Sequence, residues 1–137
     1  MLNRFCLLAL ALALIALGAA MQATTEPTIA AQQEGRVLRH LVLYKFKPEV
    51  TPDQVQQVID AFSQLPKKID GIVGFEHGPN VSPEGKSDGL TYCFNVSFRD
   101  EKARDAYLVH PAHQEYVKVV QDKRERVVVF DYWAAGK

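Results

Sequence analysis

Two periods of hydrophobic residues run along this chain and separate predicted strands from predicted helices. Some segments alternate apolar and polar side chains at every second position, or are short apolar runs bounded by turn residues, as strands do. Others repeat apolar residues every three or four positions, which is typical of amphipathic helices. The predicted strands are residues 37–47, 72–77, 91–98 and 127–133, and the predicted helices are 51–65 and 100–121. The order is strand, helix, strand, strand, helix, strand, which predicts an α+β domain.

Local signals sharpen the helix boundaries. Thr51 is expected to cap the first helix, with Pro52 at its first position and Gln54 completing a capping box. Pro66 is expected to end that helix. The pair His110–Pro111 is expected to interrupt the second helix, because a residue before proline disfavours helical geometry. The charged run 122–126 (DKRER) is interpreted as a solvated turn.

The first and last strands have more apolar residues than one buried face requires. In the first strand, His40 and Tyr44 share one face, while Leu41 and Leu43 lie on the other. The run Val127–Phe130 is apolar on both faces. Two helices cover only one face of a four-stranded antiparallel sheet, so the other face is expected to meet a second copy of the chain. The alternative is that these apolar residues are simply exposed.

The first residues differ in composition from the rest. Arg4 precedes an unbroken apolar run, Cys6–Leu17, and small residues follow it at 18–20. This pattern predicts a secretory signal peptide at residues 1–20, and hence a periplasmic or secreted protein without a membrane segment after cleavage. A retained membrane anchor is the alternative, although the run is shorter than the roughly 20 apolar residues that span a bilayer. Residues 21–35 are expected to form a flexible linker, followed by one domain at 36–134.

Charge and cysteine content limit the partners. The chain has 16 Lys and Arg against 16 Asp and Glu, and no long basic run, which argues against nucleic-acid binding. Once residues 1–20 are removed, Cys93 is the remaining cysteine, so no internal disulfide is expected.

Four segments together resemble the stress-responsive dimeric α/β-barrel (Dabb) family. They are HLVLYKFKPEV, NVSPEGKSDGLTYCFNVSF, AYLVHPAHQEYV and VVVFDYW, and the likeness runs from Arg39 to Trp133. The most specific part is the H-P-A-H element at residues 110–113. The resemblance implies a ferredoxin-like βαββαβ fold whose two sheets close into a barrel across a homodimer. Most members have no assigned reaction, although one is a polyketide cyclase.

The candidate chemistry consists of histidines and tyrosines. Tyr107 and His110 are three residues apart and are therefore expected to share a helical face, and His113 follows after one turn, past Pro111. All are expected to approach the strand face that carries His40. A tyrosine and a histidine in an apolar pocket can exchange a proton with a substrate without a cofactor.

The resemblance assigns roles to some of these residues. The catalytic tyrosine and histidine of the cyclase correspond to Tyr107 and His113, while a further histidine in its third strand is replaced here by Tyr92. The predicted pocket residues are His40, Val42, Tyr44, Phe62, Tyr92 and His110. The sequence therefore predicts a pocket for a small apolar or aromatic molecule, with no cofactor and no metal.

Three alternatives to that pocket stay open at this point. One is a cofactor-independent enzyme, cyclase-, lyase- or monooxygenase-like. Another is a purely structural role for the H-P-A-H element, whose histidines would fasten the helix to the sheet. The third is a metal held by His110 and His113.

Overall fold

The computed structural model describes residues 35–134. The signal peptide predicted at 1–20 and the linker predicted at 21–35 lie outside the described residues, apart from Gly35. The elements are, in order, β1 (Leu38–Phe46), α1 (Pro52–Ser63), α2 (Leu65–Lys68), β2 (Ile72–Pro79), β3 (Tyr92–Phe98), α3 (Glu101–Val109), α4 (Pro111–Val120) and β4 (Arg124–Trp133). Across the described residues, no helix combines the length and the hydrophobicity that a membrane crossing requires.

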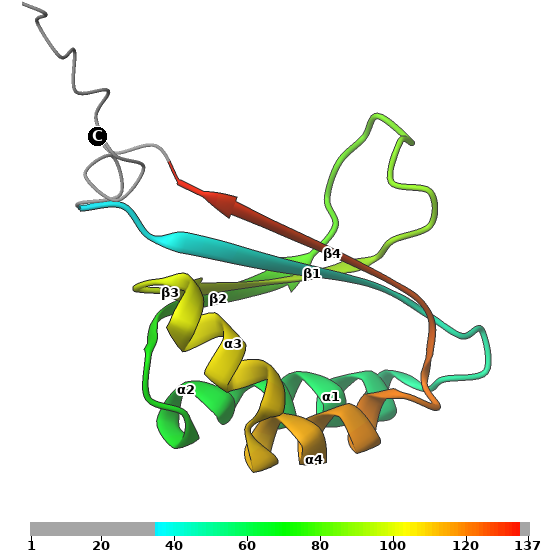
Figure 1. The fold of residues 1–137 in the computed structure, drawn as a ribbon. Helices are drawn as coiled ribbons and strands as arrows, with labels where there is room; N and C mark the ends of the chain where they lie inside the picture. Colours follow the sequence, from blue (N-terminus) through cyan, green and yellow to red (C-terminus); the bar gives the residue numbers. More distant parts are fainter. Residues whose placement is uncertain (1–34, 135–137) are drawn as a thin grey trace, which may run out of the picture.

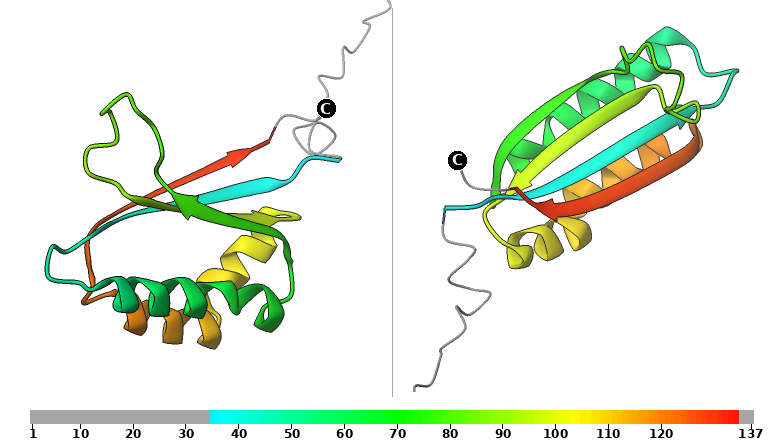
Figure 2. Two further views of the ribbon diagram at one scale, coloured as in Figure 1. Left: turned by 180° about the vertical axis from the view of Figure 1, so that it is seen from behind. Right: turned by 90° about the horizontal axis from the view of Figure 1, so that it is seen from above.

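The four strands form one antiparallel sheet in the order β2-β3-β1-β4, and the helices pack on one of its faces (Figure 1). This is the βαββαβ arrangement that the hydrophobic pattern predicts, and the fold prediction is confirmed. The view from above in Figure 2 shows the other face of the sheet, which no helix of the described chain covers.

Local sequence signals determine where the helices begin. The Thr51 hydroxyl accepts a hydrogen bond from the Gln54 N–H (3.3 Å), and the Gln54 side chain accepts one from the Thr51 N–H (2.9 Å). The predicted capping box is therefore confirmed. Pro66 was predicted to end α1, and this prediction is wrong because α1 already ends at Ser63. Pro66 instead lies in the first turn of the short helix α2. Backbone N–H groups in a first turn make no hydrogen bond within the helix, so proline is tolerated there.

The break at His110–Pro111 is also confirmed. The His110 backbone is extended (φ −65°, ψ 135°), and it ends α3 and begins α4. Its Nδ1 accepts a hydrogen bond from the Ala112 N–H (3.1 Å), so the imidazole caps α4. The prediction that Tyr107 and His110 share a helical face is wrong, because His110 lies between two helices rather than within one.

Residues 122–126 are not simply a solvated turn. β4 begins at Arg124, and its pairing with β1 shifts register opposite Lys45 and Phe46. Such a β-bulge places two residues of one strand opposite one residue of its neighbour and changes where the following side chains point. The turn prediction is therefore wrong from Arg124 onward.

An aromatic core fills the space between the helices and the sheet. Phe62 of α1 stacks on Phe94 of β3 with ring centroids 4.3 Å apart, and it also contacts Tyr116 of α4 at 4.5 Å. The other buried members of this core include Leu38, Val42, Val58, Leu65, Val96, Phe98 and Val120.

The open face of the sheet divides into two halves. On β1 and β4 it carries Leu41, Leu43, Val128, Phe130 and Tyr132, with Phe130 60% exposed. On β2 and β3 it is more polar, with Glu76 opposite Asn95 and Ser97 opposite Gly74. The surplus of apolar surface predicted from the sequence is thus concentrated on the β1 and β4 half.

Candidate ligand cavity

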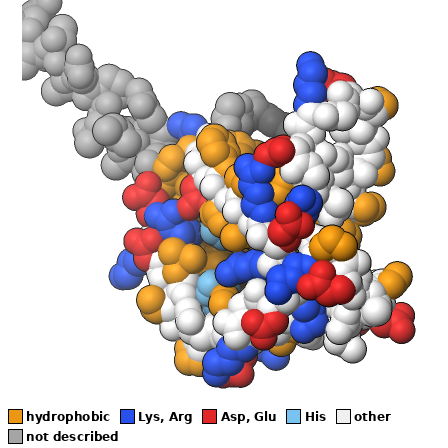
Figure 3. Space-filling model, turned by 90° about the vertical axis from the view of Figure 1, so that its right-hand side faces the viewer, with side chains coloured by type: hydrophobic (Ala, Val, Ile, Leu, Met, Phe, Trp, Pro, Cys, Tyr) orange, Lys and Arg blue, Asp and Glu red, His pale blue; other side chains and the backbone are white. Residues whose placement is uncertain are grey.

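A cavity of about 250 Å³ lies between the sheet and the helices, next to β4. Most of its wall is aliphatic or aromatic, with two histidines, an aspartate and an arginine. The lining residues are His40, Val42, Tyr44, Phe62, Tyr107, Leu108, His113, Tyr116, Val117, Arg124, Val127, Val129 and Asp131. Figure 3 shows histidine atoms at the surface between hydrophobic side chains on this side of the molecule. The partial exposure of Leu108 (39%) and Val129 (53%) indicates where the cavity opens to solvent.

The structure brings six of the eight predicted site residues to this cavity. These are His40, Val42, Tyr44, Phe62, Tyr107 and His113. The strand residues among them alternate along β1, and Tyr107 and His113 come from α3 and α4 on either side of the helix break.

Tyr92 and His110 do not line the cavity. Tyr92 lies on β3, two strands away from β4, and its hydroxyl is hydrogen-bonded to Nδ1 of His77 on β2 (2.8 Å). The His110 ring is engaged in capping α4.

His113 is held as a neutral hydrogen-bond acceptor. Its Nδ1–H donates to the Leu108 carbonyl (3.1 Å), which leaves Nε2 with a free lone pair. Burial lowers the pKa of His113, and the neighbouring His40 and His110 lower it further, against the opposing effect of the Leu108 carbonyl. The imidazole is therefore uncharged at neutral pH.

Tyr107 lies directly against His113, with ring centroids 4.2 Å apart. It is only 1% exposed and also contacts His40 and Phe98 edge-on or tilted. Burial raises the pKa of Tyr107, so its phenol stays protonated. A protonated phenol thus lies beside a neutral imidazole, and the two shifts make the phenol a weaker acid and the imidazole a weaker base than in water.

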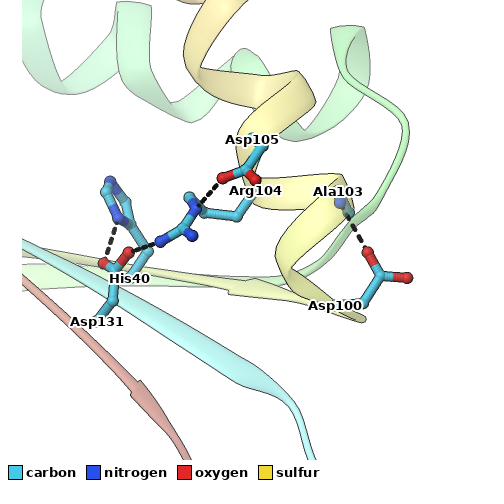
Figure 4. Close-up of polar contacts among 6 residues, drawn as sticks. All are labelled: His40, Asp100, Ala103, Arg104, Asp105 and Asp131. Atoms are coloured by element: carbon cyan, nitrogen blue, oxygen red, sulfur yellow. Dashed lines mark hydrogen bonds and ion pairs between the residues drawn. The ribbon is translucent and has the colours of Figure 1, made fainter.

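His40 belongs to a charged network that sequence reasoning missed (Figure 4). Its Nδ1 lies 2.6 Å from the Asp131 carboxylate, whose second oxygen accepts from Arg104 of α3. Arg104 also donates to Asp105 (2.7 Å). The carboxylate fixes the ring orientation and the tautomer, and leaves His40 Nε2 for the cavity. The available signal was one acidic residue within an otherwise apolar strand, in VVVFDYW.

A second polar group lies toward the other end of the cavity. The Tyr116 hydroxyl donates to the Tyr44 hydroxyl (2.9 Å) inside the core. Burial raises the pKa of Tyr44, and the hydrogen bond from Tyr116 and the nearby Arg124 guanidinium partly oppose this shift. Neither Tyr116 nor Arg124 was a predicted site residue.

This fold and this cavity match a known family over most of the described chain. The family model for the stress responsive A/B barrel domain matches residues 38–134. The chain belongs to this family. Its A/B barrel domain thus contains every element of the sheet, all four helices and every residue that lines the cavity.

Several relatives share this A/B barrel domain. The Stress-response A/B barrel domain-containing protein HS1 of Arabidopsis thaliana is 30% identical over 95 residues, covering 69% of this chain and 87% of HS1. Olivetolic acid cyclase of Cannabis sativa is 28% identical over 95 residues, covering 69% and 94%. A solved structure from a Jannaschia species, described as a dimeric ferredoxin-like protein of unknown function, is 33% identical with a TM-score of 0.62, covering 70% and 97%.

Metal ligands do not gather in the part of the A/B barrel domain that the structure describes. Residues 35–134 contain no group of three or more His, Cys, Asp or Glu side chains positioned to hold an ion. The Nδ1 atoms of His110 and His113 are each engaged with the backbone, at Ala112 and Leu108.

A larger hollow, about 590 Å³, lies on the open face beside the loop between β2 and β3. Its wall includes Leu43, Val81, Leu90, Cys93 and Tyr92, so this predicted pocket residue lines the hollow rather than the helix-side cavity. This hollow lies on the face expected to meet a second copy, and it gathers none of the histidines. The helix-side cavity is therefore the better candidate for a ligand site of the A/B barrel domain.

Proposed function

We propose that this protein is an exported homodimer that binds a small apolar or aromatic molecule in the helix-side cavity. One observation carries the binding proposal: an aliphatic and aromatic wall surrounds two imidazoles whose Nδ1 atoms are already engaged with protein groups. Each Nε2 is left to a ligand. Small-molecule sites in proteins are typically concave and mostly apolar, with a few polar groups that orient the ligand.

Blocking the cavity mouth should abolish ligand binding without unfolding the domain. Val129 lies at the mouth and is 53% exposed, so Val129→Phe adds bulk where solvent can accommodate it. Ligand-observed NMR with a set of small aromatic compounds is the measurement. Wild type should give saturation transfer, and the variant should not.

Val73→Phe is the matched control, since Val73 is 55% exposed on β2, the opposite edge strand. This variant should bind as wild type does. Equal binding by both variants would place the ligand elsewhere on the protein.

A second candidate is acid–base catalysis without a cofactor, and it has support from the contact between Tyr107 and His113. Tyr107 would donate a proton and His113 would accept one, as in a cyclase- or lyase-like reaction; monooxygenase-like chemistry is the further variant. Olivetolic acid cyclase, a relative by sequence, is an enzyme by name. Tyr107→Phe and His113→Gln should then abolish conversion of a bound keto compound while leaving its affinity within a few-fold. Unchanged turnover in both variants would reject this candidate.

The dimer proposal is supported by the apolar half of the open face and by the dimeric Jannaschia relative. Phe130→Glu introduces a charge at the centre of that half, where Phe130 is 60% exposed in the single chain. Light scattering should give a dimer for wild type and a monomer for the variant at micromolar concentration, because burying an unpaired carboxylate is unfavourable. A wild-type monomer would contradict the proposal.

The export proposal has its support in residues 1–20 alone. N-terminal sequencing of the protein from its native host would test it. A chain that still begins with Met1 would contradict cleavage.

A further inference from the structure

The β-bulge in β4 determines which charge faces the helix-side cavity. Val129 and Val127 are on the cavity side, so simple alternation would put Glu125 there next. The register shift instead pairs Phe46 with Arg124 and Lys45 with Arg126, leaving Glu125 as the extra residue. Arg124 thereby lines the cavity. Glu125 lies on the far side of the strand, where its carboxylate binds Lys45 (2.8 Å).

Arg124 differs from its neighbours in having no acidic partner among the residues that the structure describes. Glu125 is paired with Lys45, and Arg126 is paired with Asp88. Within residues 35–134, no carboxylate forms an ion pair with Arg124. A guanidinium keeps its charge at any physiological pH, and a half-buried one gains from a planar anion that accepts two hydrogen bonds.

The two ends of the cavity have different electrostatic character. Asp131 pairs in register with His40, whereas Arg124 pairs with Phe46, so the two charges are separated by roughly 20 Å of strand. Asp131 is paired with Arg104, while the phenols of Tyr44 and Tyr116 lie near Arg124. A negative group of a ligand is therefore favoured at the Arg124 end.

We propose that the cavity selects small organic carboxylates, with the carboxylate bound by Arg124 and the apolar or aromatic body directed toward Tyr107 and His113. The wall between these ends is aliphatic and aromatic, including Val42, Phe62 and Val127, and suits such a body. This inference rests on the proposed binding function, and it adds the chemical class and the orientation of the ligand. The end of the ligand away from the carboxylate would then meet the imidazole nitrogens.

Isothermal titration with 4-alkylbenzoates and the corresponding neutral 4-alkylbenzamides at pH 7 tests the selection. Wild type should bind the benzoate at least about tenfold more tightly, as expected for a charge-assisted bidentate contact. Arg124→Gln should bring the two affinities within about twofold of each other, mainly by weakening the benzoate. Arg124→Lys, which keeps the charge but not the planar fork, should give an intermediate ratio and provides a second test if the glutamine variant does not fold.

Arg126→Gln is the matched control, because it removes the same charge two residues along β4, on the open face of the sheet. This variant should keep the benzoate preference of wild type. Equal affinity of wild type for benzoate and benzamide would overturn the carboxylate inference while leaving cavity binding intact. Failure of every compound to bind would instead reject the binding function itself, and this inference with it.

Discussion

Replacing Phe62 with alanine should lower the free energy of unfolding by about 3–5 kcal/mol, the range for a fully buried phenylalanine. Phe62 is 1% exposed, and its ring lies within 4.3–5.4 Å, centroid to centroid, of Phe94, Tyr116 and Phe75. The expected loss of stability has two parts. The buried phenyl ring no longer contributes its hydrophobic free energy, and the void that it leaves cannot be closed by the three rigid rings around it. Phe62 also lines the cavity, so the void would enlarge it.

Urea unfolding followed by the fluorescence of Trp133 is the measurement. All variants should be compared at one protein concentration, because the stability of a dimer depends on it. Phe62→Leu serves as the control, since it keeps most of the volume and should cost about 1–2 kcal/mol. A loss below about 1 kcal/mol for the alanine variant would mean that Phe62 is not central to the core.

Removing the Asp131 carboxylate should also have a large effect. Asp131→Ala leaves the Arg104 guanidinium and the His40 ring without their shared partner. A fully buried pair broken in this way costs 3–5 kcal/mol, but the Asp131 and Arg104 side chains are 25% and 22% exposed. Water can therefore replace part of the interaction, and we expect a loss of about 2–3 kcal/mol in the free energy of unfolding.

Asp105→Asn is the matched control for this network. Asp105 also binds Arg104 (2.7 Å), but its side chain is 65% exposed. This variant should change stability by less than about 0.5 kcal/mol. Nitrogen-15 NMR of the imidazole gives a second readout, because the Asp131 carboxylate fixes the proton of His40 on Nδ1. Wild type should show that single tautomer and Asp131→Ala a mixture, whereas an unchanged tautomer would contradict the role of Asp131.

Phe62→Ala and Asp131→Ala test two different contributions to the structure of the same cavity. Phe62 is part of the apolar wall, whose contribution comes from packing and burial. Asp131 instead orients the imidazole of His40, one of the two histidine rings that line the cavity. Cavity binding requires both a shaped wall and directed polar groups, so a loss of ligand affinity is expected in each variant, for separate reasons.

Most of the A/B barrel architecture could be predicted from local patterns. A short apolar run located β1 and apolar alternation located β3, the Thr51 capping box located the start of α1, and His110–Pro111 located the break between α3 and α4. Each of these signals acts within a few residues, through backbone geometry or a local hydrogen bond. The likeness to a family then directed attention to His40, Tyr107 and His113, all of which line the cavity.

The charged members of the cavity could not be found in the same way. Asp131 is 91 positions from His40 in the sequence, and their contact exists only because β1 and β4 pair in one particular register. Arg124 was assigned to a solvated turn, because a β-bulge between paired strands leaves no local pattern. Tyr92 was assigned to the pocket by the family resemblance and His110 by its spacing from Tyr107, but neighbouring strands and the helix break direct them elsewhere.

The sequence by itself determined the order of the strands and helices, their caps and breaks, and the excess of apolar residues on the sheet. These depend on the period of side chains along one segment and on the conformations that proline, threonine and their neighbours allow. Only the tertiary structure decided which charges meet in the cavity, because a pair such as His40 and Asp131 depends on register between strands that are distant in the chain. A shift of one residue in β4 would turn both Arg124 and Asp131 away from the cavity.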